Sequence, residues 1–338
     1  MNRKTLYFTA PGEVELREES LPTLGADEIL VETICSAISA GTEMLIYQGR
    51  FPRDVETDSV ISTLRSDFKY PLAYGYAAVG KVVDIGKAVN KNWKDKFVFS
   101  FQPHTSHFIA TTDCLFPVPE SISCETACFL PNMETAVNLV QDAAPILGER
   151  VIVFGQGVIG LLTTALLREF PLEALVTADC YDLRRETSLK LGVSDSLDPA
   201  ANDFRNQASA YLKTGADLTF ELSGSPSALD DAITITTFSG RIVIGSWYGE
   251  KRTVLNLGGA FHRSRIRLIS SQVSTIAPEL SGRWDKARRF DIAWNALKRI
   301  KPEKWITHRF TPEMASEAYN LLNTNPQETM QVLLNFNP

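Results

Sequence analysis

The sequence predicts an α/β protein with two domains, one rich in β-strands and the other built on a doubly wound parallel sheet. Three patterns predict this fold class. Residues 1–120 form short apolar or alternating runs separated by turns, residues 150–249 alternate strand and helix patterns, and the C-terminal residues combine amphipathic helices with a last strand. A chain of 338 residues is also long enough for two cores of about 150 residues each.

The first 120 residues are predicted to form strands, with no helix of any length. Pro11-Gly12 lies between two short alternating runs, as in a β-hairpin. Residues 29–39 (ILVETICSAIS) are apolar and β-branched, as in a mostly buried strand. Further strands are predicted at 80–89, 94–102 and 107–118, so that this portion reads as a barrel-like β domain.

From residue 121 the periodicity becomes helical. Residues 121–143 predict a helix that Pro131 interrupts, with Ser123 and Thr126 at its start. Strands and helices then alternate, which predicts parallel βαβ units. The predicted strands are 151–154, 172–182, 216–225 and 240–249, and the predicted helices are 161–170, 183–192 and 227–236. Near the C-terminus, a helical face carries Phe290, Ala293, Trp294, Leu297 and Ile300.

Composition excludes several classes of protein. Lys and Arg number 34 and Asp and Glu number 40, which gives a net charge of −6 and argues against nucleic-acid and membrane-surface partners. No apolar run is long enough to span a membrane, and the N-terminal residues lack the apolar core of a signal peptide. The five cysteines form no C-x-x-C pair, which argues against a cysteine-rich zinc lobe. We therefore expect a cytoplasmic protein with reduced thiols.

A glycine-rich motif predicts a dinucleotide site. Gly155-Gln156-Gly157-Val158-Ile159-Gly160 follows an apolar strand and opens an apolar helix, which is the context that G-x-G-x-x-G requires. The first glycine permits a tight turn, the second lets the backbone approach a pyrophosphate, and the third lets helix and strand pack closely. The helix N-terminus then offers unpaired N–H groups to the phosphates.

An acidic residue completes the fingerprint of a Rossmann domain. Asp179 ends the next strand, 19 residues after Gly160, where a carboxylate binds the ribose hydroxyls and repels a 2′-phosphate. NAD is therefore expected rather than NADP. Arg184 and Arg185 lie nearby and leave open either a contact with a 2′-phosphate or a solvated helix face.

The sequence resembles the medium-chain dehydrogenase/reductase superfamily. The resemblance is carried by SAGTEMLIYQG (39–49), YGYAAVGKVVDIGKAV (74–89), the glycine-rich loop, ELSGSPSAL (221–229) and GRIVIGSWYG (240–249). It implies a GroES-like catalytic domain, 1–130 with 274–338 returning to it, and an inserted Rossmann domain at 131–273. It also implies cofactor contacts at Ser223 and Gly245, and a homodimer that pairs edge strands.

A looser resemblance links the chain to a subgroup related to bacteriochlorophyllide dehydrogenase. It rests on SAISAGTEMLIYQG, YPLAYGYAAVGKVV, HRSRIRLISSQV and ITHRF. Members of this subgroup need not share a substrate.

The positions that match the superfamily's catalytic zinc ligands carry no suitable side chains. The cysteine position is Ala40, the histidine position is Tyr76, and the third position falls near Pro131. Catalytic zinc needs three protein ligands, so we expect none here. The four histidines, His104, His107, His262 and His308, are too scattered to predict another metal site.

The resemblance also supplies candidate catalytic residues. Thr42 matches the hydroxyl that relays the proton in the zinc enzymes, and Tyr76 matches a ligand that faces the substrate oxygen. Glu43 matches a carboxylate that holds that ligand. We therefore predict that Glu43 orients Tyr76 and that Tyr76 and Thr42 contact the substrate oxygen. Leu45 replaces the next histidine of the relay.

An unusually long segment follows these residues. Residues 50–69 (RFPRDVETDSVISTLRSDFK) exceed the usual connection at this point, and in the family this stretch borders the substrate cleft. Arg50, Arg53 and Arg65 are either contacts for an anionic substrate or parts of a solvated surface loop.

Three functions remain open. The first is a zinc-independent oxidoreductase that transfers a hydride between NAD(H) and a secondary alcohol or ketone. The second is an NADPH-dependent quinone or enoyl reductase acting on an activated C=C bond. The third is a non-catalytic dinucleotide-binding protein. The first is preferred because the Asp179 carboxylate disfavours binding of NADPH. The sequence does not identify the small-molecule substrate.

Overall fold

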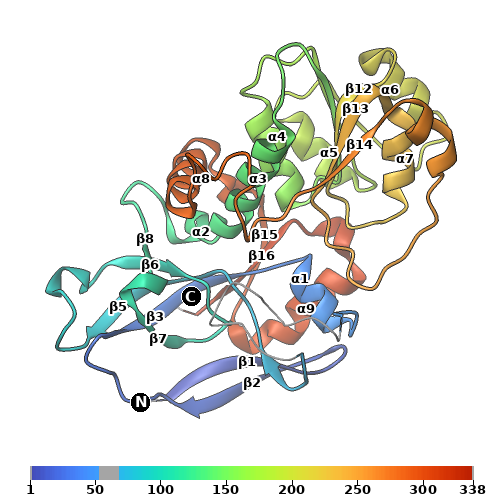
Figure 1. Ribbon diagram of the computed structural model, residues 1–338. Helices are drawn as coiled ribbons and strands as arrows, with labels where there is room; N and C mark the ends of the chain where they lie inside the picture. The colour runs from blue at the N-terminus through green and yellow to red at the C-terminus, as the bar shows by residue number, and fades with distance from the viewer. Residues whose placement is uncertain (1, 53–67, 337–338) are drawn as a thin grey trace. The chain divides into compact units, whose positions relative to one another are not determined.

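The computed structural model describes residues 2–52 and 68–336, which form an α/β fold divided into two compact units. The first unit comprises Met1–Pro131 and Leu297–Pro338, and the second comprises Asn132–Ala296 (Figure 1). The chain passes between the units within two helices, α3 (Leu130–Ala143) and α8 (Lys286–Ile300).

The first unit is rich in β-structure. It contains a three-stranded sheet in the order β2-β1-β4 and a larger sheet in the order β15-β16-β3-β5-β6-β8, with β7 pairing β3. Its strands are β1 (Asn2–Ala10), β2 (Glu13–Ser20), β3 (Glu28–Ile38), β4 (Leu72–Ala73), β5 (Ala78–Ile85), β6 (Phe97–Ser100), β7 (His107–Thr111), β8 (Phe116–Pro117), β15 (Ile306–Phe310) and β16 (Gln331–Asn335). Its helices are α1 (Thr42–Tyr47), α2 (Cys124–Ala127) and α9 (Ala315–Thr324).

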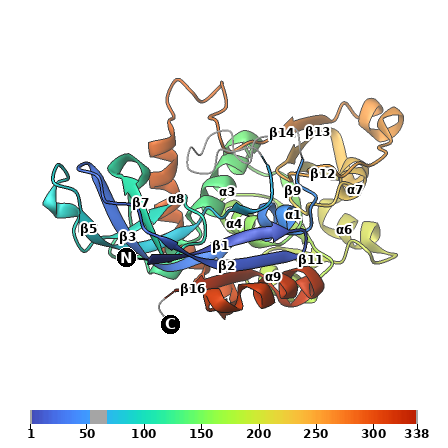
Figure 2. The ribbon, with the colours of Figure 1, turned by 90° about the horizontal axis from the view of Figure 1, so that it is seen from below.

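An apolar core fills the space between the small sheet and the helices of this unit. Leu6 and Phe8 of β1 pack with Ile46 of α1 and with Tyr319 of α9, and all four side chains are buried. Figure 2 shows α9 beside β2, consistent with this packing. Pro11-Gly12 forms the predicted turn between β1 and β2, which pair antiparallel, and Gly12 has a positive φ of 81°.

The second unit is a parallel six-stranded sheet with helices on both faces. The strand order is β11-β10-β9-β12-β13-β14, and every pairing in it is parallel, as predicted for a doubly wound sheet. Figure 1 shows α3 and α4 on one side of the strands and α6 and α7 on the other. The elements are β9 (Arg150–Phe154), α4 (Val158–Leu167), β10 (Ala174–Ala178), α5 (Asp182–Leu189), β11 (Asp195–Leu197), α6 (Phe204–Leu212), β12 (Ala216–Glu221), α7 (Ala228–Ile235), β13 (Thr236–Ile244) and β14 (Arg267–Ser270).

Several elements differ from the sequence-based predictions. Helix α1 lies where only strands are predicted, and β11 and α6 occur in a stretch that shows no clear periodicity. The helix start at Ser123 is confirmed, because its Oγ accepts a hydrogen bond from Thr126 N at 3.1 Å. None of the helices among residues 2–52 and 68–336 is long and apolar enough to cross a membrane.

The first domain resumes later in the chain than the predicted residue 274, and a buried arginine explains the difference. Arg289, whose side chain has no exposed surface, donates to Glu134 Oε1 at 2.7 Å and to Asn138 Oδ1 at 2.7 Å. It also donates to the carbonyls of Val273 and Thr275. These bonds tie the start of α8 and the 273–275 segment to α3, so that residues up to Ala296 group with the parallel sheet.

Replacing Arg289 tests the contribution of this buried pair to stability. Arg289→Met keeps an apolar stem but leaves the Glu134 carboxyl buried without its cation, so we expect a loss of about 3–5 kcal/mol in the free energy of unfolding. Urea denaturation followed by tryptophan fluorescence measures it. The matched control is Lys298→Met, on the exposed face of α8, with an expected change within about 0.5 kcal/mol. Equal effects of the two substitutions would contradict this role for Arg289.

Candidate active site

The glycine-rich loop has the geometry of a phosphate cradle. Gly155 has φ of +89°, and a Cβ there would lie 2.5 Å from the Leu222 carbonyl oxygen. A Cβ on Gly160 would lie 1.9 Å from the Gly155 oxygen, so helix and turn approach closely only because both residues are glycines. At Gly157, by contrast, the nearest atom to a Cβ would be Arg184 Nη1 at 4.0 Å. Space therefore lies in front of Gly157, at the start of α4, where Val158 and Ile159 present backbone N–H groups.

Asp179 links this loop to the start of α5. Its Oδ2 accepts a hydrogen bond from Gln156 N at 2.7 Å, and its Oδ1 accepts one from Tyr181 N at 2.9 Å. Arg184 Nη1 lies 3.8 Å from Asp179 Oδ2. The Cζ atom of its guanidinium lies over the Tyr181 ring, 4.7 Å from the ring centroid. Each carboxylate oxygen has a second lone pair that can accept a ribose hydroxyl. The loop, the helix start and Asp179 together fit a dinucleotide.

The remaining predicted cofactor residues occupy structural positions in the second unit. The Gln156 side chain is buried and bonds to Gly155 O and Thr164 Oγ1, so it is not available to a ligand. A Cβ on Gly245 would lie 2.5 Å from Leu139 Cδ2, which makes close packing a sufficient reason for glycine.

Ser223 is hydrogen-bonded to the carboxyl of Glu221, a residue that the sequence analysis does not single out. Ser223 is exposed and donates from its N and Oγ to Oε1 of Glu221 at the end of β12. Glu221 is fully buried, and Tyr248 Oη donates to its Oε2 at 2.5 Å. Burial and this carboxyl raise the pKa of Tyr248. The Glu221 carboxyl thus joins the end of β12 to the segment that follows β13.

In the first unit, Glu43 is the centre of a buried hydrogen-bond cluster. Its side chain has no exposed surface. Glu43 Oε1 accepts from Ser39 N at 3.0 Å, and Oε2 accepts from the Tyr319 hydroxyl and lies 2.9 Å from His104 Nε2. Burial and the adjacent Glu43 raise the pKa of Tyr319 well above its usual value. Both carboxyl oxygens are therefore engaged within the unit.

His104 extends the cluster to Ser36. Its Nδ1 lies 2.6 Å from Ser36 Oγ, so Ser36, His104 and Glu43 have the connectivity of a hydrolase triad. All three side chains are nevertheless buried, with at most trace exposure, so no substrate carbonyl reaches Ser36 Oγ. Gly75 permits the arrangement, because at its φ of +138° a Cβ would lie 2.9 Å from His104 Cδ2. The triad-like chain is a packing element and not a nucleophile.

The structure places Ser39 between Tyr76 and Glu43. The half-buried Tyr76 donates from Oη to Ser39 Oγ at 2.6 Å, and Ser39 N binds Glu43. Thr42, half-buried at the first position of α1, donates from its N to Ser39 Oγ at 3.2 Å. The three predicted catalytic residues are thus brought together, but through Ser39. The prediction that Glu43 itself orients Tyr76 is replaced by one in which Ser39 does so.

Comparisons with known proteins extend over the whole chain. Residues 158–290 match the family model described as zinc-binding dehydrogenase. The chain is 23% identical to the starvation-sensing protein RspB of Escherichia coli K12, over 98% of this chain and 99% of that one, and 23% identical to the sorbitol dehydrogenase of Gallus gallus, over 97% and 94%. A crystal structure of the alcohol dehydrogenase rspB of E. coli CFT073, complexed with NADH, has a TM-score of 0.80 at 18% identity and covers 99% of both chains.

The matches to the family model, to these relatives and to this structure agree with the resemblance to the medium-chain dehydrogenase/reductase superfamily. The two units of the chain have the fold of that crystal structure, and the sorbitol dehydrogenase among its relatives supports an oxidoreductase. The family model matches the dinucleotide-binding part of the chain. It does not include residues 40 and 76, the positions at which zinc ligands would be expected.

The donor set at those superfamily positions does not fit catalytic zinc. Ala40 offers no ligand atom, the Tyr76 hydroxyl binds Ser39, and Pro131 has no donor side chain. Within residues 2–52 and 68–336, no three His, Cys, Asp or Glu side chains are grouped as metal ligands. We therefore derive no chemical step through zinc. Arg53 and Arg65 lie outside the described residues, and Arg50 is exposed.

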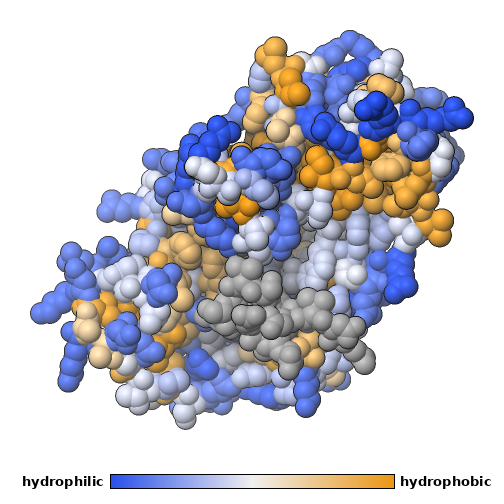
Figure 3. Space-filling view, viewed as in Figure 1, coloured by the Kyte–Doolittle hydropathy of each residue, from blue (hydrophilic) through white to orange (hydrophobic). Residues whose placement is uncertain are grey.

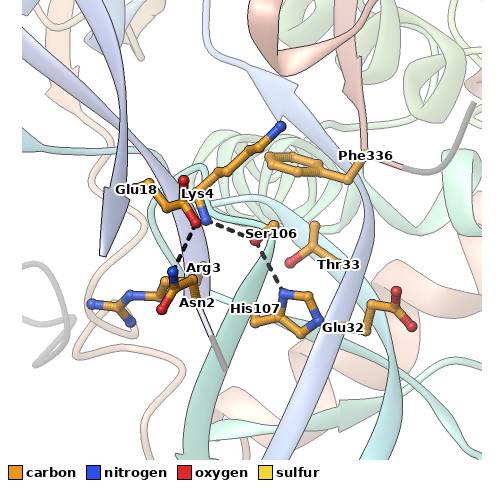
Figure 4. Close-up of a pocket in the computed structure, with 9 residues that line it drawn as sticks. All are labelled: Asn2, Arg3, Lys4, Glu18, Glu32, Thr33, Ser106, His107 and Phe336. Atoms are coloured by element: carbon orange, nitrogen blue, oxygen red, sulfur yellow. Dashed lines mark hydrogen bonds between the residues drawn. The ribbon is translucent and has the colours of Figure 1, made fainter. Parts of the chain in front are cut away.

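A separate cavity of about 280 Å³ lies in the first unit (Figure 4). It is lined by Asn2, Arg3, Lys4, Glu18, Glu32, Thr33, Ser106, His107 and Phe336, and it includes none of the predicted site residues. Burial lowers the pKa of His107, whose Nδ1 lies 3.0 Å from Ser106 Oγ.

Sequence reasoning missed three residues of the Glu43 cluster. Ser39 lies in the SAGTEMLIYQG segment that carries the resemblance, but it matches none of the catalytic positions there, and its Oγ accepts from Thr42 N. His104 and Tyr319 had no signal in the sequence, since they lie 61 and 276 positions from Glu43. Only tertiary structure brings them to the carboxyl.

The Tyr319–Glu43 bond predicts a pH dependence of stability. Because the pKa of Tyr319 is higher in the folded chain than in the unfolded chain, its contribution is complete below about pH 10 and is lost above that, where the unfolded chain ionises first. Tyr319→Phe should lower stability at pH 7 by about 1.5–3 kcal/mol and flatten the decline above pH 10. Urea titrations at a series of pH values measure both. If the free energy of unfolding fell equally steeply above pH 10 in the parent chain and in Tyr319→Phe, the raised pKa would not belong to Tyr319.

Proposed function

We propose that the protein is a zinc-independent oxidoreductase that transfers a hydride between NAD(H) and a secondary alcohol or ketone. The observation that carries the proposal is the cluster in which Tyr76 Oη and Thr42 N both donate to Ser39 Oγ, next to positions 40 and 76, which match metal ligands of the zinc enzymes. Without a metal, hydrogen-bonding side chains have to stabilise the oxygen that gains or loses charge. The fold and the polyol dehydrogenase relatives support the same reaction class.

In this proposal, one set of residues binds the cofactor and another set exchanges a proton with the substrate. When bound, the dinucleotide supplies or accepts the hydride. The glycine-rich loop and Asp179 hold its phosphates and ribose, while the hydroxyls of Tyr76 and Thr42 contact the substrate oxygen. Glu43 is a positioning residue, since its carboxyl oxygens already accept bonds from Ser39 N and Tyr319 and contact His104.

A second function has one observation in its favour. Arg184 lies beside Asp179 and over Gly157, where a 2′-phosphate would find a cation. An NADPH-dependent reductase of an activated C=C bond would use that contact. We favour NAD because the Asp179 carboxylate faces the same place and repels a second negative charge. The five free cysteines support a cytoplasmic location for either enzyme.

Cofactor preference tests the proposal directly. We expect the protein to bind NADH at least about 10-fold more tightly than NADPH, because Asp179 repels the 2′-phosphate. Asp179→Asn should reduce this ratio by about 10-fold, since it removes the charge and keeps one acceptor oxygen. Fluorescence titration with each nucleotide measures the four dissociation constants.

The control for this test is a neighbouring carboxylate. Asp182→Asn removes the same charge from an exposed side chain at the start of α5, and we expect it to leave the ratio unchanged. NADPH binding better than NADH would overturn the NAD assignment. Metal analysis of the same preparation, before and after chelation, tests zinc independence. One tightly held zinc per chain that is needed for turnover would overturn the zinc-free mechanism.

We also propose that the protein is a homodimer paired along β14. This strand is an edge of the parallel sheet, and Leu268 on it is exposed, as are Phe238, Trp247, Val254 and Leu257. Figure 3 shows apolar side chains gathered over the region that contains β14 and α7. An exposed apolar edge strand favours pairing with another strand.

Leu268→Lys tests the pairing. We expect the molar mass from light scattering to fall from the dimer to the monomer, because the charge would be buried in the interface. Leu147→Lys, at an exposed leucine outside this region, is the control and should leave the mass unchanged. A wild-type monomer would contradict the proposal.

A further inference from the structure

Ser39 has a hydrogen-bonding arrangement that sets it apart from the other hydroxyls of the cluster. Its Oγ lies 2.6 Å from Tyr76 Oη and 3.2 Å from Thr42 N, and both of these atoms donate to it. A hydroxyl has two acceptor lone pairs and one proton to donate. Both lone pairs of Ser39 are therefore used, and its proton has no acceptor among residues 2–52 and 68–336.

The backbone of Ser39 is held in place. Ser39 is half-buried and lies between β3 and α1, where its main chain is fixed because Ser39 N binds the buried Glu43 carboxyl at 3.0 Å. Two donors that point at one oxygen also polarise its O–H bond, which makes the hydroxyl a stronger donor. The side chain is thus held in place, polarised and able to donate to a ligand oxygen.

We propose that Ser39 is the catalytic residue that exchanges a proton with the substrate oxygen, and that Tyr76 acts behind it by resupplying that proton. The inference rests on the proposed function and refines it, because it replaces two independent hydroxyl contacts with a relay in series. Thr42 holds Ser39 through its N–H, and Glu43 positions Ser39 through its carboxyl.

The proton balance of the relay is complete in both directions. During ketone reduction, the carbonyl carbon gains the hydride, the C=O π bond breaks, and the oxygen takes the proton of Ser39 Oγ. Ser39 Oγ regains a proton from Tyr76 Oη, and the half-buried Tyr76 recovers one from water. Alcohol oxidation runs through the same steps in reverse, with release of one proton to water.

A series relay and two independent contacts predict different double-variant kinetics. For a relay, Ser39→Ala should lower kcat by about 100-fold and Tyr76→Phe by about 10-fold, and the double variant should match Ser39→Ala within about 3-fold. If the two contacts were independent, the two losses of kcat would instead multiply to about 1,000-fold in the double variant. Ser39→Thr keeps the hydroxyl and should retain kcat within about 5-fold of the parent chain.

The assay uses NADH oxidation with a panel of acetoin, D-fructose and dihydroxyacetone, and NADH oxidation is followed by absorbance. The dissociation constant of NADH, measured by fluorescence without a ketone, should be unchanged in all variants, which separates a loss of proton transfer from misfolding. Multiplied effects in the double variant, or a loss below about 3-fold in Ser39→Ala, would overturn the relay while the proposed function stands. A parent chain that binds NADH but turns over no ketone and no corresponding alcohol would overturn the proposed function, and the relay with it.

Discussion

The buried Glu43 carboxyl is the constraint on which the first unit depends. A carboxyl without solvent contact is costly unless its oxygens are hydrogen-bonded. Here the contacts come from the turn before α1, from His104 and from Tyr319 of α9. Parts of the chain that are far apart in sequence must therefore assemble around one side chain, and the turn that carries Ser39 and Thr42 takes its shape from this assembly.

Asp179 has the same role in the second unit, on a smaller scale. It receives backbone N–H groups from Gln156 in the glycine-rich loop and from Tyr181 before α5. Binding of a ribose would use the lone pairs that remain. Cofactor recognition and the conformation of the loop are therefore coupled, so the charge of Asp179 can be tested with an isosteric amide but not with a truncated side chain.

If the proposed function is correct, the hydroxyls around Ser39 act next to positions that hold a metal in the zinc enzymes of the superfamily. A metal lowers the cost of an alkoxide by its charge. Hydroxyls offer less charge, and in the proposed mechanism a fixed geometry in which one hydroxyl polarises the next would compensate for this. That geometry depends on a rigid turn, and the bond from Ser39 N to Glu43 supplies it.

The sequence by itself determined the fold class, the Gly155–Gly160 loop and the strand that ends at Asp179, because local periodicity and spacing encode these features. The resemblance to the superfamily, and not periodicity, identified Ala40 and Tyr76 as positions without zinc ligands. The same resemblance supplied Thr42, Glu43 and Tyr76 as candidates. Only the tertiary structure showed that Ser39 stands between Tyr76 and Glu43, and that His104 and Tyr319 surround the carboxyl. The physical reason is that a buried polar group takes its partners from whichever segments pack against it, and no local pattern records that choice.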